Sequence, residues 1–99
     1  MATYEELFEL RQSSDLLNKI TTAITVKCKA VIDDAGATSG QKDWARTYYK
    51  TPELLKKEVI WPVLEANKSS SVAQIQGATD NAIQSNVSSA IDDLIADLT

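Results

Sequence analysis

The chain has 99 residues, the size of one small domain, so we expect a single domain over residues 1–99. Hydrophobic residues make up 43% and charged residues 24%, a balance that favours folding over disorder. The absence of histidine removes the usual general base and the commonest metal ligand. Gly36, Gly40 and Gly77 are too far apart to form a phosphate-binding loop. The composition therefore argues against an enzyme, a metal site, a cofactor and a small-molecule substrate.

Signals for targeting and for redox chemistry are also sparse. No apolar run approaches the roughly 20 residues that a membrane-spanning helix needs, and no secretory signal is visible. The single cysteine, Cys28, lies inside a helical pattern of apolar residues, so we expect a buried hydrophobe rather than a reactive thiol. We expect a chain made in a reducing cytoplasm and without a membrane partner.

The first half of the chain has strong helix signals. Thr3 and Glu6 have capping-box spacing, in which hydroxyl and carboxylate each accept a hydrogen bond from a free backbone amide. The polar residues 13–15 predict a break after this short helix. Apolar residues then recur every three or four positions, which predicts a central helix over 16–35. We expect this helix to stop at Gly36 in the left-handed conformation that glycine adopts without steric cost.

A third helix is predicted after the loop at 36–40, with Ser39 as its candidate cap. Trp44 and Tyr48 are four residues apart, so this helix places them on one face.

A fourth helix is predicted to start at Thr51 and Pro52, because proline suits a first helical turn. Pro62 lies inside this helix, where it removes a backbone hydrogen bond, so the helix either bends between Glu58 and Trp61 or ends and restarts. We favour a bend, because helix-forming residues continue beyond the proline.

The last part of the chain predicts one helical turn and one longer helix. Ser71 and Gln74 have capping-box spacing before Gly77, and Thr79 or Asp80 then caps the closing helix. The expected buried stripe of that helix is Ile83, Val87, Ala90, Ile91, Leu94 and Leu98. The predicted fold is all-α, with four to five helices in a small irregular bundle and one helix kinked near Pro62.

Charge is distributed unevenly along the chain. The net charge is minus three over residues 1–15, plus three over 16–68 and minus four over 69–99. The basic middle contains interspersed glutamates, and a calculated pI of 4.6 opposes phosphate binding, so we do not expect direct contact with nucleic acid.

The predicted interface combines acidic and aromatic residues. The carboxylates at the end of the last helix are placed where the helix dipole disfavours them. They either meet a basic patch on a partner or simply keep a helix end solvated. Among the aromatic residues we expect Trp61 to be mainly core, while Trp44 or Tyr49 stays partly exposed for a partner. The candidate interface residues are Trp44, Tyr49, Asp92, Asp93 and Asp97.

Three stretches in the second half carry a resemblance to a known class of proteins. They are Trp44-Ala45-Arg46, the segment Trp61-Pro62-Val63-Leu64 with Asn67, and the run 78–87. The layout is a tryptophan-bearing helix, a serine-rich break and a closing amphipathic helix. It resembles small all-helical virion proteins encoded in the structural modules of tailed bacteriophages. The proline directly after Trp61 departs from that pattern, and no functional residue is carried over.

The resemblance implies a non-enzymatic virion protein from the capsid or the head–tail region, made in the host cytoplasm and present in many copies. Its partners would be other virion proteins or itself, and its two acidic ends and basic middle could pack head-to-tail. One alternative is a small acidic adaptor or inhibitor that binds a basic partner as a monomer. Another is an enzyme built on carboxylates and lysine, although the adjacent pairs Asp33–Asp34 and Asp92–Asp93 point to different helix faces.

Overall fold

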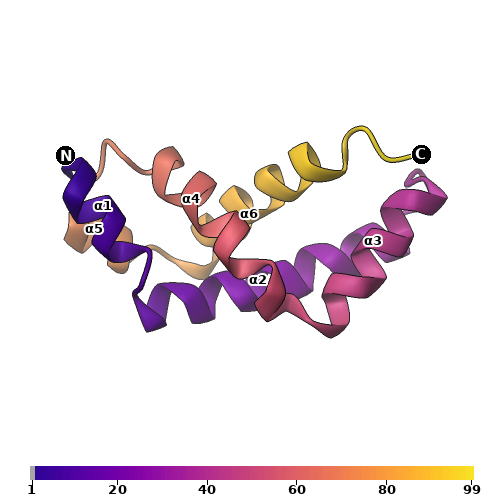
Figure 1. Ribbon diagram of the computed structural model, residues 1–99, viewed down its shortest axis with the longest axis horizontal. Coiled ribbons are helices and arrows are strands. Elements are labelled where there is room, and N and C mark those ends of the chain that lie inside the picture. Colours follow the sequence, from indigo (N-terminus) through magenta and orange to yellow (C-terminus); the bar gives the residue numbers. More distant parts are fainter. Residues whose placement is uncertain (1) are drawn as a thin grey trace.

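Helix α2 is the element around which the other long helices pack. The computed structural model describes residues 2–99, and within them α2 contacts α3, α4 and α6 (Figure 1). Its side chains Ile20, Ile24 and Cys28 are completely buried by these neighbours. The elements are α1 (Tyr4–Leu10), α2 (Ser14–Asp33), α3 (Ser39–Lys50), the 3-10 turn η1 (Pro52–Leu54), α4 (Lys56–Ala66), α5 (Val72–Gln76) and α6 (Asp80–Ile95).

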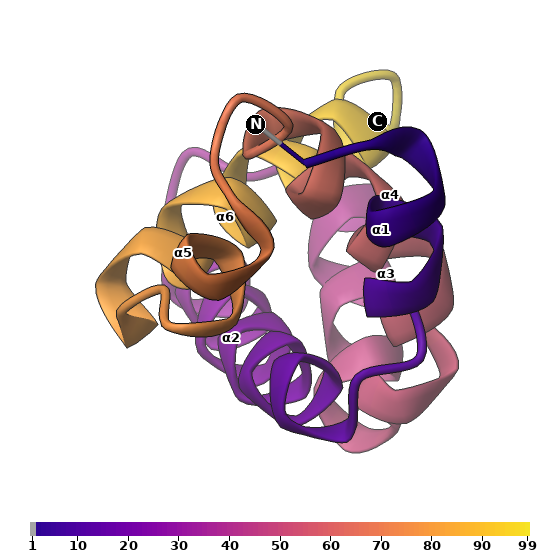
Figure 2. The same ribbon diagram turned by 90° about the vertical axis from the view of Figure 1, so that its left-hand side faces the viewer.

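The prediction of an all-α fold is confirmed, since 76% of the chain is helical and no strand occurs among residues 2–99. The structure has six α helices where four to five are predicted, because the single turn expected after Ser71 forms the five-residue helix α5. The molecule measures 40 by 21 by 20 Å. Viewed from its left-hand end, α2, α5 and α6 lie on one side and α1, α3 and α4 on the other (Figure 2).

Side chains close to each helix start explain where most helices begin. The capping boxes predicted at Thr3 and at Ser71 are both confirmed, and a third forms between Thr38 and Gln41. The expected cap at Ser39 is therefore wrong by one residue. The expected break before α2 is confirmed, because the Ser13 hydroxyl accepts a hydrogen bond from the backbone of the new helix.

Helix α4 continues through Pro62, which excludes a helix that ends there and restarts. Proline has no N–H, so the Glu58 carbonyl loses the hydrogen bond that it would normally accept from residue 62. Both residues are exposed, so water can replace this bond. The predicted start at Thr51 is wrong for the α helix. The Thr51 hydroxyl donates to the Thr47 carbonyl instead, and the proline opens η1 before α4 begins at Lys56.

Two expectations about α2 and α6 are wrong. Helix α2 ends at Asp33 and not at residue 35, and Gly36 does not have a positive φ. The Asp34 carboxylate accepts a hydrogen bond from the Gly36 amide and closes the turn without the left-handed conformation. Leu94 was expected in the buried stripe of α6, but it is 46% exposed and Ile95 is buried in its place.

The end of the chain packs against the start of α3. The Thr38 hydroxyl donates to the Leu98 carbonyl at 3.0 Å, and Gln41 Nε2 donates to the Ile95 carbonyl at 3.0 Å. The Gly40 amide donates to the Thr99 carbonyl at 3.2 Å, and a Cβ at Gly40 would lie 2.8 Å from that same oxygen. This close approach requires glycine at position 40.

No helix among residues 2–99 is long and apolar enough to cross a membrane.

Alanine substitutions at two glycines test this description of the turns. Gly36→Ala should raise the free energy of unfolding by about 0.4–1 kcal/mol, because its φ suits alanine and a Cβ meets only the Asp34 side chain at 3.4 Å. Gly40→Ala should be less stable than Gly36→Ala by about 1 kcal/mol or more, because its Cβ meets rigid backbone. Urea denaturation measures both. Equal gains at the two positions would contradict the packing of Thr99 against α3.

Candidate interaction surface

The exposed apolar side chains are the most unusual feature of the surface. Isolated exposed apolar residues are normal, but a contiguous group indicates an interaction site. Several of the exposed side chains are aromatic, and two of these lie on α1. The large hydrophobic residues that are exposed are Tyr4, Phe8, Val26, Tyr49, Leu54 and Leu94.

One group joins α1 and α4. Tyr4 and Phe8 are four residues apart on α1, and they are 66% and 43% exposed. The Tyr4 ring meets the Trp61 ring of α4 edge-on, with centroids 5.6 Å apart and planes at 69°. Trp61, which the sequence predicts to be mainly core, packs against the core but is only half-buried.

Two cations border this aromatic group on the side facing α4. The Arg11 guanidinium carbon lies 4.1 Å from the centre of the Phe8 ring, a cation–π contact. Arg11 also lines a hollow of about 420 Å³ together with Gln12 and Lys57. We call Tyr4, Phe8, Trp61, Arg11 and Lys57 the aromatic face.

A second exposed group lies at the end of α6. Leu94 is four residues after the buried Ala90 and four before the half-buried Leu98, so it continues the core-facing side of the helix. In Figure 1 the C-terminal half of α6, the part of the helix that contains Leu94, extends beyond α4. The exposed carboxylates Asp93 and Asp97 flank it. We call Asp93, Leu94 and Asp97 the acidic edge.

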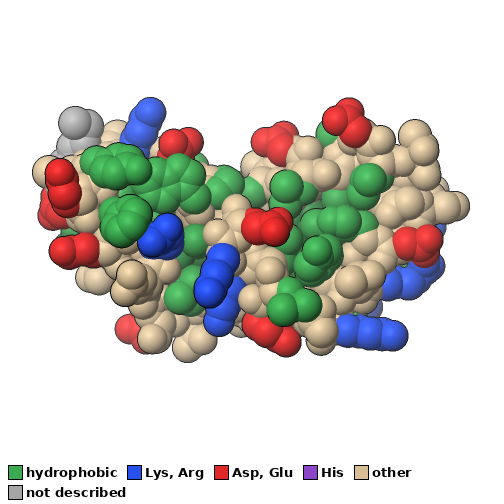
Figure 3. All heavy atoms as spheres, in the orientation of Figure 1, with side chains coloured by type: hydrophobic (Ala, Val, Ile, Leu, Met, Phe, Trp, Pro, Cys, Tyr) green, Lys and Arg blue, Asp and Glu red, His purple; other side chains and the backbone are tan. Residues whose placement is uncertain are grey.

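The space-filling view shows hydrophobic side chains gathered in two separate groups on one long face of the molecule (Figure 3). One group covers α1 and α4 at the left, with basic side chains beside it. The other lies between α3, α4 and α6 at the right, with acidic side chains above it along α6. The two groups therefore share a face, and side chains of both charges lie around each of them.

The five interface residues predicted from the sequence do not form one cluster. Asp92 binds Lys27 of α2 at 2.7 Å within the chain, while Asp93 and Asp97 face solvent on the acidic edge. The half-buried Trp44 stacks on Tyr48 with ring centroids 4.7 Å apart. Tyr49 is 42% exposed, but the five-residue spacing from Trp44 puts it on another side of α3.

The sequence analysis missed the aromatic residues of α1. Neither Tyr4 nor Phe8 is among the interface residues predicted from the sequence, although Phe8 is exposed while Leu7 and Leu10 on the same helix are buried. The available signal was the spacing of Tyr4 and Phe8, which gives α1 a second apolar stripe beside the buried one.

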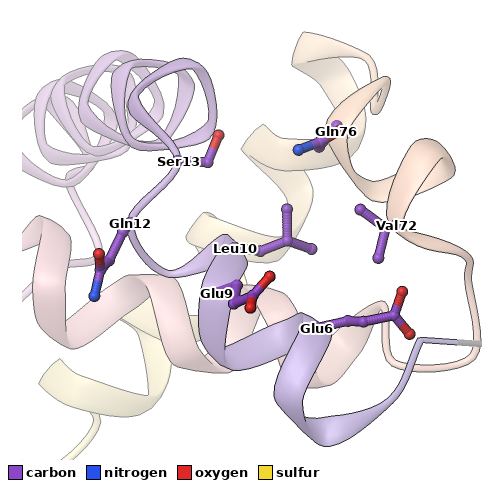
Figure 4. Close-up of a pocket in the computed structure, with 7 residues that line it drawn as sticks. All are labelled: Glu6, Glu9, Leu10, Gln12, Ser13, Val72 and Gln76. Atoms are coloured by element: carbon purple, nitrogen blue, oxygen red, sulfur yellow. The ribbon is translucent and has the colours of Figure 1, made fainter.

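The single thiol is buried, and carboxylates line a hollow between α1 and α5. Cys28 is 0% exposed, and this burial raises the pKa of the thiol from 9.0 to about 11, so it stays protonated at neutral pH. A hollow of about 380 Å³ between α1 and α5 contains the carboxylates Glu6 and Glu9 (Figure 4). Glu6 accepts the Thr3 amide at 2.8 Å, and this contact lowers its pKa.

No group of three or more metal-ligating side chains occurs within residues 2–99. The sequence matches no protein-family model, and no curated protein and no solved structure is significantly similar to it.

The raised pKa of Cys28 predicts a loss of stability in alkali. The unfolded thiol ionises near pH 9.0 while the folded one stays protonated to about pH 11, so unfolding becomes easier as the pH rises through this window. Between about pH 8 and about pH 11 the unmodified chain should lose about 2 kcal/mol more of its free energy of unfolding than the Cys28→Ala variant loses. Lysine and tyrosine titration is common to both proteins and cancels in the comparison. Parallel pH profiles from urea denaturation would contradict the burial of Cys28.

Proposed function

We propose that this chain is a non-enzymatic structural or assembly protein of a tailed-phage virion, associated with the capsid or the head–tail junction and present in many copies. The resemblance of the 44–46, 61–67 and 78–87 segments supports the class of protein. The observation that supports an assembly role is the aromatic face, where the exposed Tyr4 and Phe8 of α1 lie beside the half-buried Trp61 of α4, which contacts Tyr4.

The composition of this surface supports protein partners. Protein interfaces are enriched in aromatic residues and arginine and depleted in lysine and glutamate at their centres, and the aromatic face places Arg11 directly on Phe8. Its partners are other virion proteins or further copies of itself. A chain with a net charge of minus four has no electrostatic reason to bind nucleic acid nonspecifically. Synthesis takes place in the host cytoplasm and the mature location is the virion.

Several ionisable side chains are engaged in the fold itself, which fits a structural role. The only cysteine is buried with a raised pKa, and Glu6 is occupied by its own helix cap. Lys27 of α2 and Asp92 of α6 form an ion pair 2.7 Å apart.

A second candidate function is a small acidic adaptor or inhibitor that binds a basic surface as a monomer. The observation that favours it is the acidic edge, where Asp93 and Asp97 stay unpaired beside the exposed Leu94. On this alternative one chain binds one partner molecule, and its copy number in any particle is low.

Quantitative mass spectrometry of purified particles tests the proposed function. Particles of the phage whose genome encodes this chain should contain its peptides at many copies relative to the portal protein, and they should keep them through density-gradient purification. An unrelated cytoplasmic protein of similar size from the infected cell is the control for carry-over. Recovery of the chain only in the soluble lysate, at the level of that control, would contradict a virion role.

A further inference from the structure

We propose that the long face of this protein binds a second copy of the chain in an antiparallel, two-fold symmetric dimer. In this dimer the aromatic face of each copy covers the acidic edge of the other. The inference rests on the proposed multi-copy function and specifies the first contact by which copies associate.

The two surfaces complement each other in chemistry. The aromatic face offers three partly exposed rings beside Arg11 and Lys57, and the acidic edge offers one exposed leucine and two exposed carboxylates. Leucine against aromatic rings removes apolar surface from water on both partners. The two carboxylates then lie near the two cations, which steers association and sets its orientation.

The placement of the surfaces selects a closed dimer. Helix α1, which carries Tyr4 and Phe8, lies at one end of the molecule, and the C-terminal end of α6, which carries the acidic edge, lies toward the other (Figure 1). A two-fold axis lying in the plane of the long face and perpendicular to its length reverses one copy end for end. Each aromatic face then meets the acidic edge of the other copy, and the same contact forms twice. An isologous contact of this kind closes at two subunits and leaves neither surface open.

The available area fits a stable complex. The long face measures 40 by 21 Å, which can accommodate the roughly 800 Å² per partner that a standard protein interface buries. Either apolar group alone covers only part of that area, so one head-to-tail contact would leave the other group exposed.

Glutamates restrict the direction of approach. Glu5 and Glu9 line a shallow hollow with Tyr4 and Phe8, away from the side where Arg11 meets Lys57. A partner carboxylate arriving from the side of these glutamates would be repelled. The favoured approach is from the side of Arg11 and Lys57, which lies toward α4.

Charge reversal on each surface tests the dimer. One variant carries Arg11→Glu and Lys57→Glu, and the other carries Asp93→Lys and Asp97→Lys. All four side chains are exposed, so both variants should fold, which circular dichroism and urea denaturation check. In sedimentation velocity each variant alone should self-associate about tenfold or more weakly than the unmodified chain. An equimolar mixture should recover dimers, because each reversed surface then faces its complement.

The matched control reverses the cation Lys29 on α2 and the cation Lys42 on α3 to glutamate, which changes the net charge by the same amount as the first variant. This control should dimerise like the unmodified chain. A failure of the mixture to recover dimers would overturn the contact, as would masses that grow beyond two chains. An unmodified chain that stays monomeric at all concentrations would also overturn it. None of these results would contradict the proposed function, because the chain could still be present in purified particles. The mass-spectrometry experiment tests that function separately.

Discussion

Burial of one side of α2 is the interaction on which the rest of the structure depends. Ile20, Ile24 and Cys28 are fully enclosed, and α3, α4 and α6 each pack against this helix. Burying a leucine-sized side chain contributes about 1.5–3 kcal/mol, so a continuous stripe outweighs the weak intrinsic stability of the shorter helices. Polar contacts from the same helix then fix its neighbours in place. Lys27 binds Asp92 of α6, and the Ala23 carbonyl accepts a hydrogen bond from Gln84 of the same helix.

The features that the sequence predicts well are those decided within a few residues. The capping boxes at Thr3 and Ser71 were predictable because a hydroxyl and a carboxylate or amide three residues apart act on their own helix start. The exposure of Leu94 was not, because it depends on which helices lie nearby. The end of α2 differs from the prediction because the Asp34 carboxylate, and not a left-handed Gly36, closes the turn. The acidic residues of the candidate site were found from charge alone. Its aromatic half was missed because the arrangement of α1 beside Trp61 is a tertiary contact.

A stable core and an incompletely covered surface together explain the proposed role. The core occupies the interior between the two sides of the bundle, yet rings on α1 and α4 and a leucine on α6 stay open to water. Exposed apolar groups of this kind weaken solubility unless a partner covers them. In a virion component the partner is always present at high local concentration. The cations of the aromatic face and the carboxylates of the acidic edge provide the orientation that symmetric assembly requires.

Isotope-filtered NMR on a mixed sample tests the central claim most directly. Half of the chains carry ¹³C-labelled leucine and half are unlabelled, so the filtered spectrum reports only contacts between copies. The Leu94 methyl protons of one copy should show cross-peaks to the ring protons of Tyr4, Phe8 or Trp61 of the other, and these should disappear in Asp93→Lys, Asp97→Lys protein. A mixed sample at millimolar concentration without cross-peaks between these residues would contradict the claim that copies of this chain meet through the aromatic face and the acidic edge.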